Sequence, residues 1–292
     1  SLVLILLGWV FVPFYLRTGV YTMPEFLEKR YSKACRSYLS VISILAYVIT
    51  KISLIIFAGA LVFETIGIPF WTGAIITVLA TGFYTVLGGL KAVIYTDMVQ
   101  AFILLIGTIA VTAFGLYALG GWDHMIDVIT MASVQEGNPP TEQFFNLWRP
   151  MADTEYPWTG MLFGAPILGV WYWCTDQYIV QRTLSAKDVN NARKGALFAG
   201  YLKLLPVFIF FIPGVIAYAL LQEGRIDFSM ENADQALPAM INGFLPSGLK
   251  GLAIAGLLAA LMSSLSSAFN SSSTLLTIDF YQKYKPKATQ KD

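Results

Sequence analysis

Long apolar stretches, separated by shorter polar ones, repeat along the whole chain. A helix needs about 20 residues to cross the hydrocarbon core of a bilayer, and six apolar stretches have about this length. They lie at about 37–63, 70–88, 97–118, 158–180, 195–221 and 250–278, and residues 1–16 have the character of the last part of a further helix. The pattern predicts an all-α polytopic membrane protein.

The charges of the loops predict the side of the membrane on which each loop lies. Short cytoplasmic loops accumulate Lys and Arg, and alternate loops carry 14 of the 19 basic residues. The intervening side holds three and includes a long acidic loop at 119–157, in which we expect a short interfacial helix. Four basic stretches are therefore assigned to the cytoplasm: 17–36, 89–96, 181–194 and the tail from Lys283.

The composition places the chain in the membrane class. It is 56% hydrophobic and 13% charged, with a mean hydropathy of +0.63, which is too apolar for a water-exposed surface. The net charge of +1 does not indicate the basic surface that binds nucleic acid. Cys35 and Cys174 lie in different surroundings and are interpreted as free thiols. The sequence has no Cys/His set with metal spacing and no glycine-rich phosphate loop, so we do not expect an enzyme.

The segment 158–180 combines helix-loosening residues with aromatic, acidic and amide side chains. Three glycines and a proline lie between 160 and 169, and the run WYWCTDQYIVQR follows at 171–182. An apolar segment interrupted in this way indicates a transporter binding site. An aromatic belt at the interface would explain the Trp and Tyr residues but not the acid. One helical face carries Gly169, Tyr172, Trp173, Asp176 and Val180.

Two lysines fall inside apolar segments, where ionisable side chains default to a functional role. Lys51 is near the middle of 37–63, and placing its charge there costs on the order of 3 kcal/mol. It must face a cavity or a partner, which leaves two alternatives: the solute pathway, or an acid such as Asp176. Lys203 lies about eight residues, roughly 12 Å of helix, from the cytoplasmic end of its segment. Snorkelling is difficult at that depth, so we predict a role in the solute pathway.

Hydroxyl side chains are concentrated in the cytoplasmic half of 250–278, beginning at Ser263. Small hydroxyl residues in membrane helices mostly permit close packing and bond to their own backbone. A hard monovalent cation needs several oxygen ligands, which adjacent hydroxyls and a carbonyl supply in part. Spacing alone leaves both interpretations open. Asp97 stands at the start of an expected helix, where an ordinary N-terminal cap is the simplest interpretation.

Five stretches, in order along nearly the whole chain, closely resemble the sodium/glucose branch of the sodium:solute symporter family. Five matches in the family's order are not expected by chance. They are YTMPEF at 21–26, GGLKAVIYTD at 88–97, GVWYWCTDQ with the following QR at 169–182, GYLK at 200–203 and MSSLSSAFNS at 262–271.

The resemblance implies a LeuT-like core of two inverted five-helix repeats, in which 158–180 is the discontinuous first helix of the second repeat. In such relatives the positions that match Tyr172 and Trp173 lie beside the sugar, with the tyrosine as a cytoplasmic-side gate. The positions that match Lys203 and Lys51 are polar contacts in or near the sugar site.

The resemblance also implies a sodium site. The positions that match Ala260, Ser263 and Ser264 give a backbone carbonyl and two hydroxyls to a sodium ion. The position that matches Asp97 lies on the cytoplasmic ion-release path, which favours a functional role over the cap.

Two departures from the family pattern limit what is carried over. Gly169 stands where sugar-transporting relatives place a hydrogen-bonding Asn or Thr, so the solute hydroxyl at this point is read differently or through water. Residues 1–292 are also expected to be a partial transmembrane domain, with about six full membrane helices and the end of one more. The resemblance implies that the first core helix, most of the second and the last core helices are missing. The chain also opens within an apolar stretch, as expected for a fragment.

The expected function is sodium-coupled secondary active symport of a sugar or sugar-like solute by alternating access. The protein is expected to be a multi-pass protein of the cell membrane, inner or plasma, whose partners are the solute, the cotransported sodium ion and the bilayer. A non-transporting solute sensor on the same scaffold is an alternative from another functional class. Such a sensor would tolerate loss of the ion site, so the presence of Ser263 and Ser264 favours transport. A sodium symporter of another small solute, such as an inositol, a nucleobase or an amino acid, is a third, which Gly169 keeps open.

Overall fold

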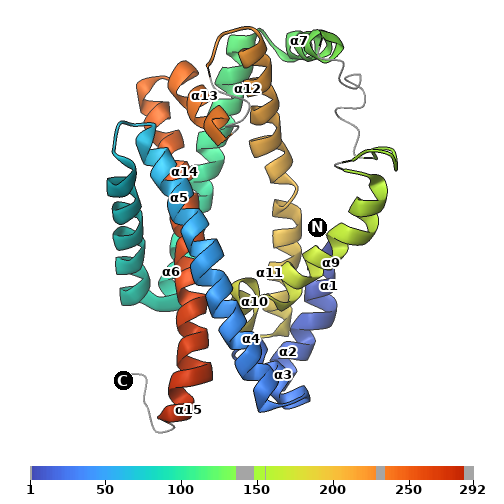
Figure 1. The fold of residues 1–292 in the computed structure, drawn as a ribbon, viewed down its shortest axis with the longest axis vertical. Coiled ribbons are helices and arrows are strands. Elements are labelled where there is room, and N and C mark those ends of the chain that lie inside the picture. The colour runs from blue at the N-terminus through green and yellow to red at the C-terminus, as the bar shows by residue number, and fades with distance from the viewer. Residues whose placement is uncertain (1, 136–147, 155, 228–233, 286–292) are drawn as a thin grey trace.

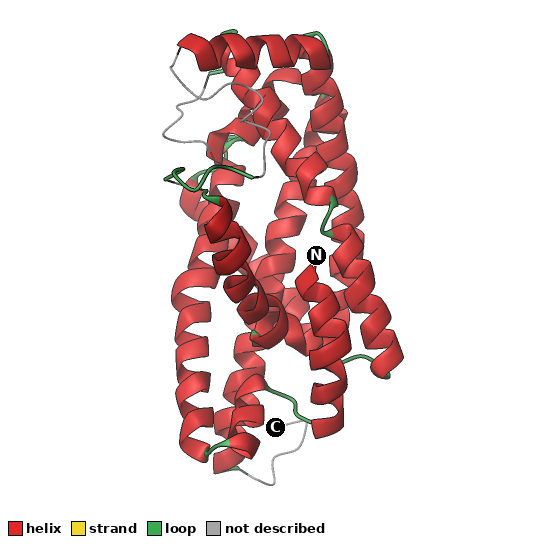
Figure 2. Cartoon of the chain, turned by 90° about the vertical axis from the view of Figure 1, so that its right-hand side faces the viewer, coloured by secondary structure: helices red, strands yellow, loops and turns green. Residues whose placement is uncertain are grey.

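The computed structural model describes residues 2–135, 148–154, 156–227 and 234–285. These residues are almost entirely helical (Figure 2), and extended pairing among them is limited to one isolated bridge between Arg149 and Pro157. Most of the long helices run along the long axis of the molecule (Figure 1). The all-α architecture agrees with the prediction from the apolar pattern.

The described helices have the following bounds in chain order. They are α1 (Leu2–Leu6), α2 (Val12–Thr18), α3 (Met23–Arg30), α4 (Lys33–Ala46), α5 (Ser53–Glu64), α6 (Phe70–Leu119), α7 (Trp122–Gln135), α9 (Ala165–Val170), α10 (Gln177–Leu184), α11 (Val189–Leu202), α12 (Ile212–Gln222), α13 (Ala236–Phe244), α14 (Ser247–Leu276) and α15 (Gln282–Tyr284). Wider π-helical turns interrupt or extend them at η1 (Leu7–Phe11), η2 (Tyr47–Ile52), η3 (Gly160–Gly164), η4 (Trp171–Thr175), η5 (Val207–Phe211) and η7 (Thr277–Tyr281).

Four continuous helical stretches are long and apolar enough to cross a membrane. A fifth is formed if Leu2–Thr18 and Met23–Arg30, which bend by 72° between them, count as one span. The four are Lys33–Glu64, Phe70–Leu119, Val189–Gln222 and Ser247–Tyr284. Each expected apolar segment is thus largely helical, while the number of full membrane helices remains a prediction.

α6 is two helices joined at a sharp bend. Gly89 has φ 56° and ψ −159°, values that a residue with a Cβ rarely adopts. Figure 1 shows the chain descending along the first half of α6 and rising again along the second. The bend lies directly after the apolar stretch expected at 70–88. The expected loop at 89–96 is wrong, however, because the second half is helical directly after Gly89, so Asp97 lies inside a helix and is not an N-terminal cap.

Three helices that begin within the expected cytoplasmic loops, α3, α4 and α11, start at side-chain caps. The Thr22 hydroxyl accepts a hydrogen bond from the Glu25 amide at 3.2 Å, and the Ser32 hydroxyl accepts one from Cys35 at 3.4 Å. The Asp188 carboxylate accepts one from Asn191 at 2.8 Å, at the start of α11. These side chains satisfy backbone donors that have no partner within the helix, which fixes where each helix starts.

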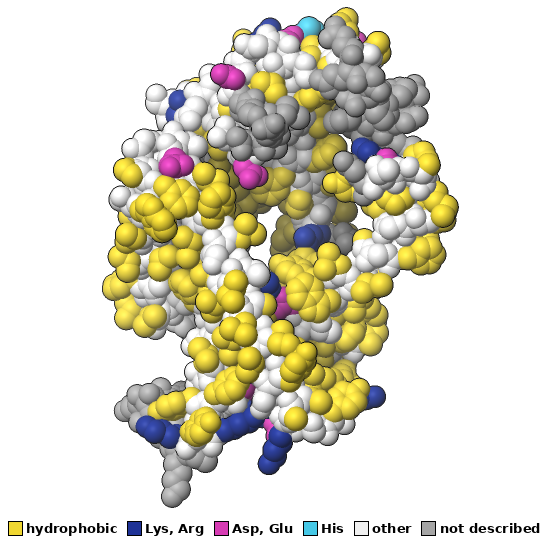
Figure 3. Space-filling view, in the orientation of Figure 1, with side chains coloured by type: hydrophobic (Ala, Val, Ile, Leu, Met, Phe, Trp, Pro, Cys, Tyr) yellow, Lys and Arg dark blue, Asp and Glu magenta, His cyan; other side chains and the backbone are white. Residues whose placement is uncertain are grey.

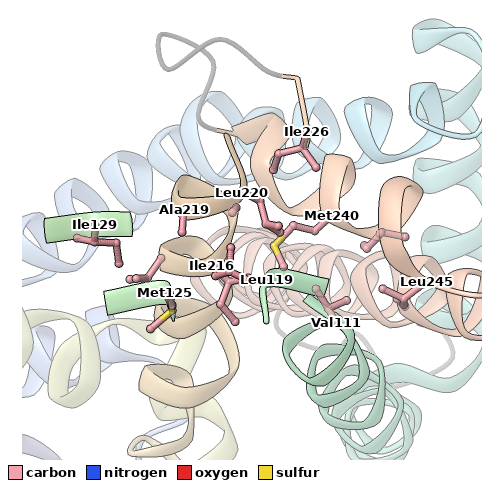
Figure 4. Packing of buried hydrophobic residues seen from close by; sticks show 14 of the residues in the cluster. Val111, Leu119, Met125, Ile129, Ile216, Ala219, Leu220, Ile226, Met240 and Leu245 are labelled. Carbon is pink, nitrogen blue, oxygen red and sulfur yellow. The ribbon is translucent and has the colours of Figure 1, made fainter. Parts of the chain in front are cut away.

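The largest buried apolar cluster lies where α12 packs between α6, α7 and α13 (Figure 4). Ile216, Leu220 and Met240 are completely buried there. Small residues bring α14 and the second half of α6 into close contact. A Cβ added at Gly107 would lie 2.9 Å from the Ala253 Cα, and one at Gly256 would lie 3.1 Å from the Leu104 Cα. Close approach at glycine is typical of helix pairs in membranes.

The surface is apolar around the middle and charged at the ends. Figure 3 shows Lys and Arg side chains gathered at the lower end of the molecule, where α2, α3 and α15 lie (Figure 1). Large apolar side chains such as Leu79, Phe83 and Phe102 are more than half exposed. This distribution suits a protein surrounded by lipid, with the basic end in the cytoplasm as the loop charges predict. The acidic loop 119–157 contains α7, and its residues 136–147 and 155 lie outside the described part.

Candidate functional site

The segment 158–184 is a broken helix, and the break lies at Asp176. Asp176 has φ −75° and ψ 125°, an extended conformation between η4 and α10. The glycine-rich turns before it form η3 and the start of α9 without ending the helix, so they loosen the segment but do not break it. The Asp176 side chain is buried, and it caps α10 by accepting a hydrogen bond from the Tyr178 amide at 3.2 Å.

Lys51 and Tyr47 of η2 reach the same carboxylate. The Lys51 ammonium forms an ion pair with one oxygen of Asp176, and the Tyr47 hydroxyl donates to the other. Of the two alternatives left open by the sequence for Lys51, the structure contains the pair with Asp176. Polar groups from a second helix therefore stabilise the helix break inside this apolar segment. Unpaired backbone groups and charges within a membrane need such partners.

The predicted solute residues Tyr172, Trp173 and Lys203 lie together. The rings of Tyr172 and Trp173 meet edge to face with centroids 5.1 Å apart. The Lys203 ammonium lies 4.5 Å from the centroid of Trp173. Lys203 is exposed and follows the last residue of α11, where its apolar segment is interrupted before Pro206. An exposed ammonium on an aromatic face can donate hydrogen bonds to a polar solute while the ring covers an apolar face of it.

Gly169 lies against Val3 of α1. A Cβ at this position would lie 3.1 Å from a methyl carbon of Val3 in α1. The absent side chain thus permits close contact between α9 and α1, an aspect that the sequence interpretation did not contain.

The predicted ion residues form a polar contact between α6, α10 and α14. The Ser263 hydroxyl donates to one oxygen of the Asp97 carboxylate, and Arg182 of α10 binds the other at 2.6 Å. The same guanidinium nitrogen contacts the Ser267 hydroxyl. Arg182 therefore connects the broken helix to the hydroxyl-rich face of α14.

Ser264 and Ala260 lie on the same side of α14 as Ser263, since residues at i, i+3 and i+4 share a helical face. Both are partly buried. The Ser264 carbonyl accepts a hydrogen bond from the Tyr178 hydroxyl at 3.2 Å. Hydroxyl and carbonyl oxygens beside a carboxylate are the hard donors that an alkali cation prefers.

A further polar network ties the cytoplasmic end of this region together. The Gln177 side chain accepts from the Met23 amide at 2.9 Å and donates to the Tyr21 carbonyl at 3.2 Å. Between these two residues, the Thr22 hydroxyl donates to Asp279 at 3.0 Å. The linker before α3 is therefore held both by the broken helix and by η7, which follows α14.

Two cavities flank the broken helix. One, of about 450 Å³, is lined by Lys51, Tyr47, Trp171 and Asp176 together with apolar residues of α2 to α4. The other, of about 350 Å³, is lined by Trp173 and by residues of α1, α10 and α11. Figure 3 shows a hollow in this part of the molecule, with basic and acidic side chains inside it and at its lower rim.

Sequence reasoning missed several residues of this region. Tyr47 and Tyr178 look like ordinary aromatic residues of apolar segments, and their hydroxyl partners depend on tertiary contacts. Arg182 belonged to the run at 171–182 and to the basic loop after it, but the sequence alone indicated no partner for it. Asp279 carried a signal that could have been used, because an acid directly after a long apolar helix needs a partner.

Comparison with known proteins adds the family. The whole chain, residues 1–292, matches the sodium:solute symporter family. It is 39% identical over 315 residues to the sodium/glucose cotransporter 1 of Oryctolagus cuniculus, a match that covers 100% of this chain and 48% of that protein. It is also 39% identical to the sodium/mannose cotransporter SLC5A10 of Bos taurus, covering 99% of this chain and 52% of that protein. The chain thus spans about half the length of these relatives.

The fold also matches a solved structure. The structure of a Na⁺-coupled sialic acid symporter in a substrate-bound outward-open state superposes with a TM-score of 0.81 and 24% identity, covering 96% of this chain and 59% of that one. This likeness confirms the expected fold class, an all-α polytopic membrane protein that forms part of a LeuT-like transporter core. With its full length matched by the family and 39% identity to the relatives above, the chain belongs to the sodium:solute symporter family.

Proposed function

We propose that the protein containing this chain carries out sodium-coupled secondary active symport of a sugar or sugar-like solute by alternating access. The relatives are sodium/glucose and sodium/mannose cotransporters, which supports this ion and this class of solute. Relatives that are transporters also favour transport over catalysis. The sodium ion is the cotransported cargo, and the cell membrane is the site of action.

The observation that carries the proposal is the contact between the broken helix and α14. Arg182, six residues after the break, bonds to Asp97 and Ser267, and Asp97 bonds to Ser263. Symport requires that occupancy of the ion site and of the solute site influence each other. A direct polar contact between the two segments provides a physical route for that influence.

The proposed assignments follow from this arrangement. Tyr172, Trp173 and Lys203 border the solute, with Gly169 and Lys51 beside them, and Tyr172 is the cytoplasmic-side gate. Ala260, Ser263 and Ser264 supply oxygen ligands to sodium. Asp97 lies on the path by which sodium leaves toward the cytoplasm.

Transport by the full-length protein in proteoliposomes tests the proposal. We expect uptake of one or more members of a panel of labelled sugars, driven by an inward sodium gradient and lost when choline replaces sodium. Uptake that is equal in sodium and choline would contradict sodium coupling. Saturable sugar binding without any uptake would instead support the solute sensor, and selective uptake of an inositol, nucleobase or amino acid would assign a different solute.

A further inference from the structure

The Lys51 ammonium is enclosed on several sides. Its nitrogen lies 4.5 Å from the ring centroids of both Tyr47 and Tyr178, and 5.5 Å from that of Tyr172. The Lys51 side chain is 21% exposed and its partner Asp176 is 3% exposed. Aromatic faces stabilise a cation electrostatically, so the rings and the carboxylate together take the place of water around this ammonium.

Asp176 is the residue at which the helix breaks, and each of its carboxylate oxygens has a partner. One oxygen pairs with Lys51, and the other accepts from the Tyr47 hydroxyl and from the Tyr178 amide. The Tyr178 amide also lies 3.2 Å from the Tyr47 hydroxyl. The conformation of the break is therefore defined by two side chains from η2, Lys51 and Tyr47, which lie 125 and 129 residues earlier in the chain.

These contacts bear on the proposed solute site because the break directly follows the aromatic run. Tyr172 is four residues before Asp176, and its ring centroid lies 5.5 Å from the Lys51 ammonium and 5.1 Å from the Trp173 centroid. Asp176 directly follows η4, which holds Tyr172 and Trp173, so its contact with Lys51 anchors the end of that turn. The ammonium that closes this contact is already bound and mostly covered, unlike the exposed ammonium of Lys203.

We propose that Lys51 and Asp176 are a positioning pair, which fixes the broken helix and thereby the Tyr172 and Trp173 rings, and that Lys51 affects the solute through Asp176 without being a solute ligand. Tyr47 is the third member of this arrangement. The inference concerns the solute site of the proposed symporter and rests on that function, but the pair itself can be tested separately.

A double-mutant cycle in the full-length protein tests the pair. Lys51→Met keeps most of the length of the side chain and removes its charge, and Asp176→Asn keeps the shape and the ability to cap α10. Either single change leaves one buried charge without its partner, which is more harmful than removing both. We expect each single variant to raise the solute concentration for half-maximal uptake by about 10-fold or more, and Lys51→Met/Asp176→Asn to return to within about 3-fold of the wild type.

The matched control uses the other intramembrane lysine. Lys203→Met combined with Asp176→Asn should show no recovery, because the Lys203 ammonium lies on the Trp173 ring and not on Asp176. If the Lys51→Met/Asp176→Asn protein remains as impaired in solute affinity as Lys51→Met, Lys51 is itself a solute ligand and the inference is overturned. A loss of solute affinity in the double variant that equals the sum of the two single losses would overturn it as well.

Thermal melting tests the pair separately from the transport function. The proteins are the detergent-solubilised wild type, Lys51→Met, Asp176→Asn and Lys51→Met/Asp176→Asn. Both single variants should melt at lower temperature and the double variant should recover most of the loss. This result is expected even if the wild type shows no sodium-dependent uptake, an outcome that would refute the proposed function alone. Melting temperatures that fall further in the double variant would refute the pair regardless of transport.

Discussion

Arg36 and Asp279 form a buried ion pair that joins the start of α4 to η7, the turn that follows α14. The distance from the Arg36 Nη2 to the Asp279 Oδ1 is 2.7 Å, and the Asp279 side chain is fully buried. The Ser40 hydroxyl donates to the second oxygen at 2.6 Å, and Thr22 donates to the first. Both oxygens of this carboxylate therefore have partners, as a buried charge requires.

Asp279→Leu should destabilise the protein strongly, because it leaves the Arg36 guanidinium without its buried partner. Loss of one member of such a pair costs about 3 to 5 kcal/mol. The measurement is the thermal midpoint of the solubilised full-length protein. Glu28→Gln is the matched control, because Glu28 is the other carboxylate that pairs with Arg36. The Glu28 side chain is 21% exposed, so this change should cost no more than about 1 kcal/mol. Equal losses for the two variants would contradict the structural role of Asp279.

Replacing Ser263 and Ser264 together with Ala should raise the sodium concentration needed for uptake. The change removes two hard oxygen ligands but keeps small side chains, so the packing of α14 against α6 should survive. Asp97 keeps its contact with Arg182 in this variant. Uptake should fall at ordinary sodium and recover in part at high sodium. Ser273→Ala, at an exposed position of the same helix, is the control. Unchanged sodium dependence in a well-expressed double variant would mean that the two hydroxyls only pack.

Lys203→Ala should weaken solute affinity and leave sodium binding nearly unchanged. Loss of one charge-assisted hydrogen bond typically costs about 1.5 to 3 kcal/mol, or roughly 10- to 150-fold in affinity. Solute and sodium titrations of uptake measure the two effects separately. Lys194→Ala, an exposed lysine in the same helix α11, should leave both titrations unchanged. Equal loss of both affinities in Lys203→Ala would indicate a structural role for the lysine.

Gly169→Asn should lower the thermal midpoint, because the new side chain meets Val3 of α1. The Cβ alone would lie 3.1 Å from a Val3 methyl, and overpacking of this kind typically costs about 1 to 3 kcal/mol. Val3→Ala makes space at the same contact, so Val3→Ala/Gly169→Asn should melt close to Val3→Ala alone. Gly169→Ala should have a small effect, since its gain in helix propensity of about 1 kcal/mol offsets the contact. A Gly169→Asn protein with higher solute affinity and unchanged melting would place this residue in the solute site.

The fold class and the segments that carry the candidate site residues follow from the sequence alone. Apolar stretches of bilayer length can only be helices, because no other single segment satisfies its own backbone in lipid. Asp176 and the lysines at 51 and 203 stood out because an ionisable side chain in an apolar segment costs free energy unless it has a partner or faces a cavity. These arguments need no knowledge of which segments are neighbours.

Which of these residues contact one another depends on the tertiary structure. Lys51 pairs with Asp176 and Lys203 lies on Trp173, although both lysines look alike in the sequence. Asp97 lies within α6 and bonds to Ser263 and Arg182, where local spacing had favoured a cap. Helical periodicity gives the face on which a side chain lies, but the partner across that face depends on how distant segments pack. Contacts between residues more than 100 positions apart are set by that packing, which is why the pair at the helix break became visible only in the folded chain.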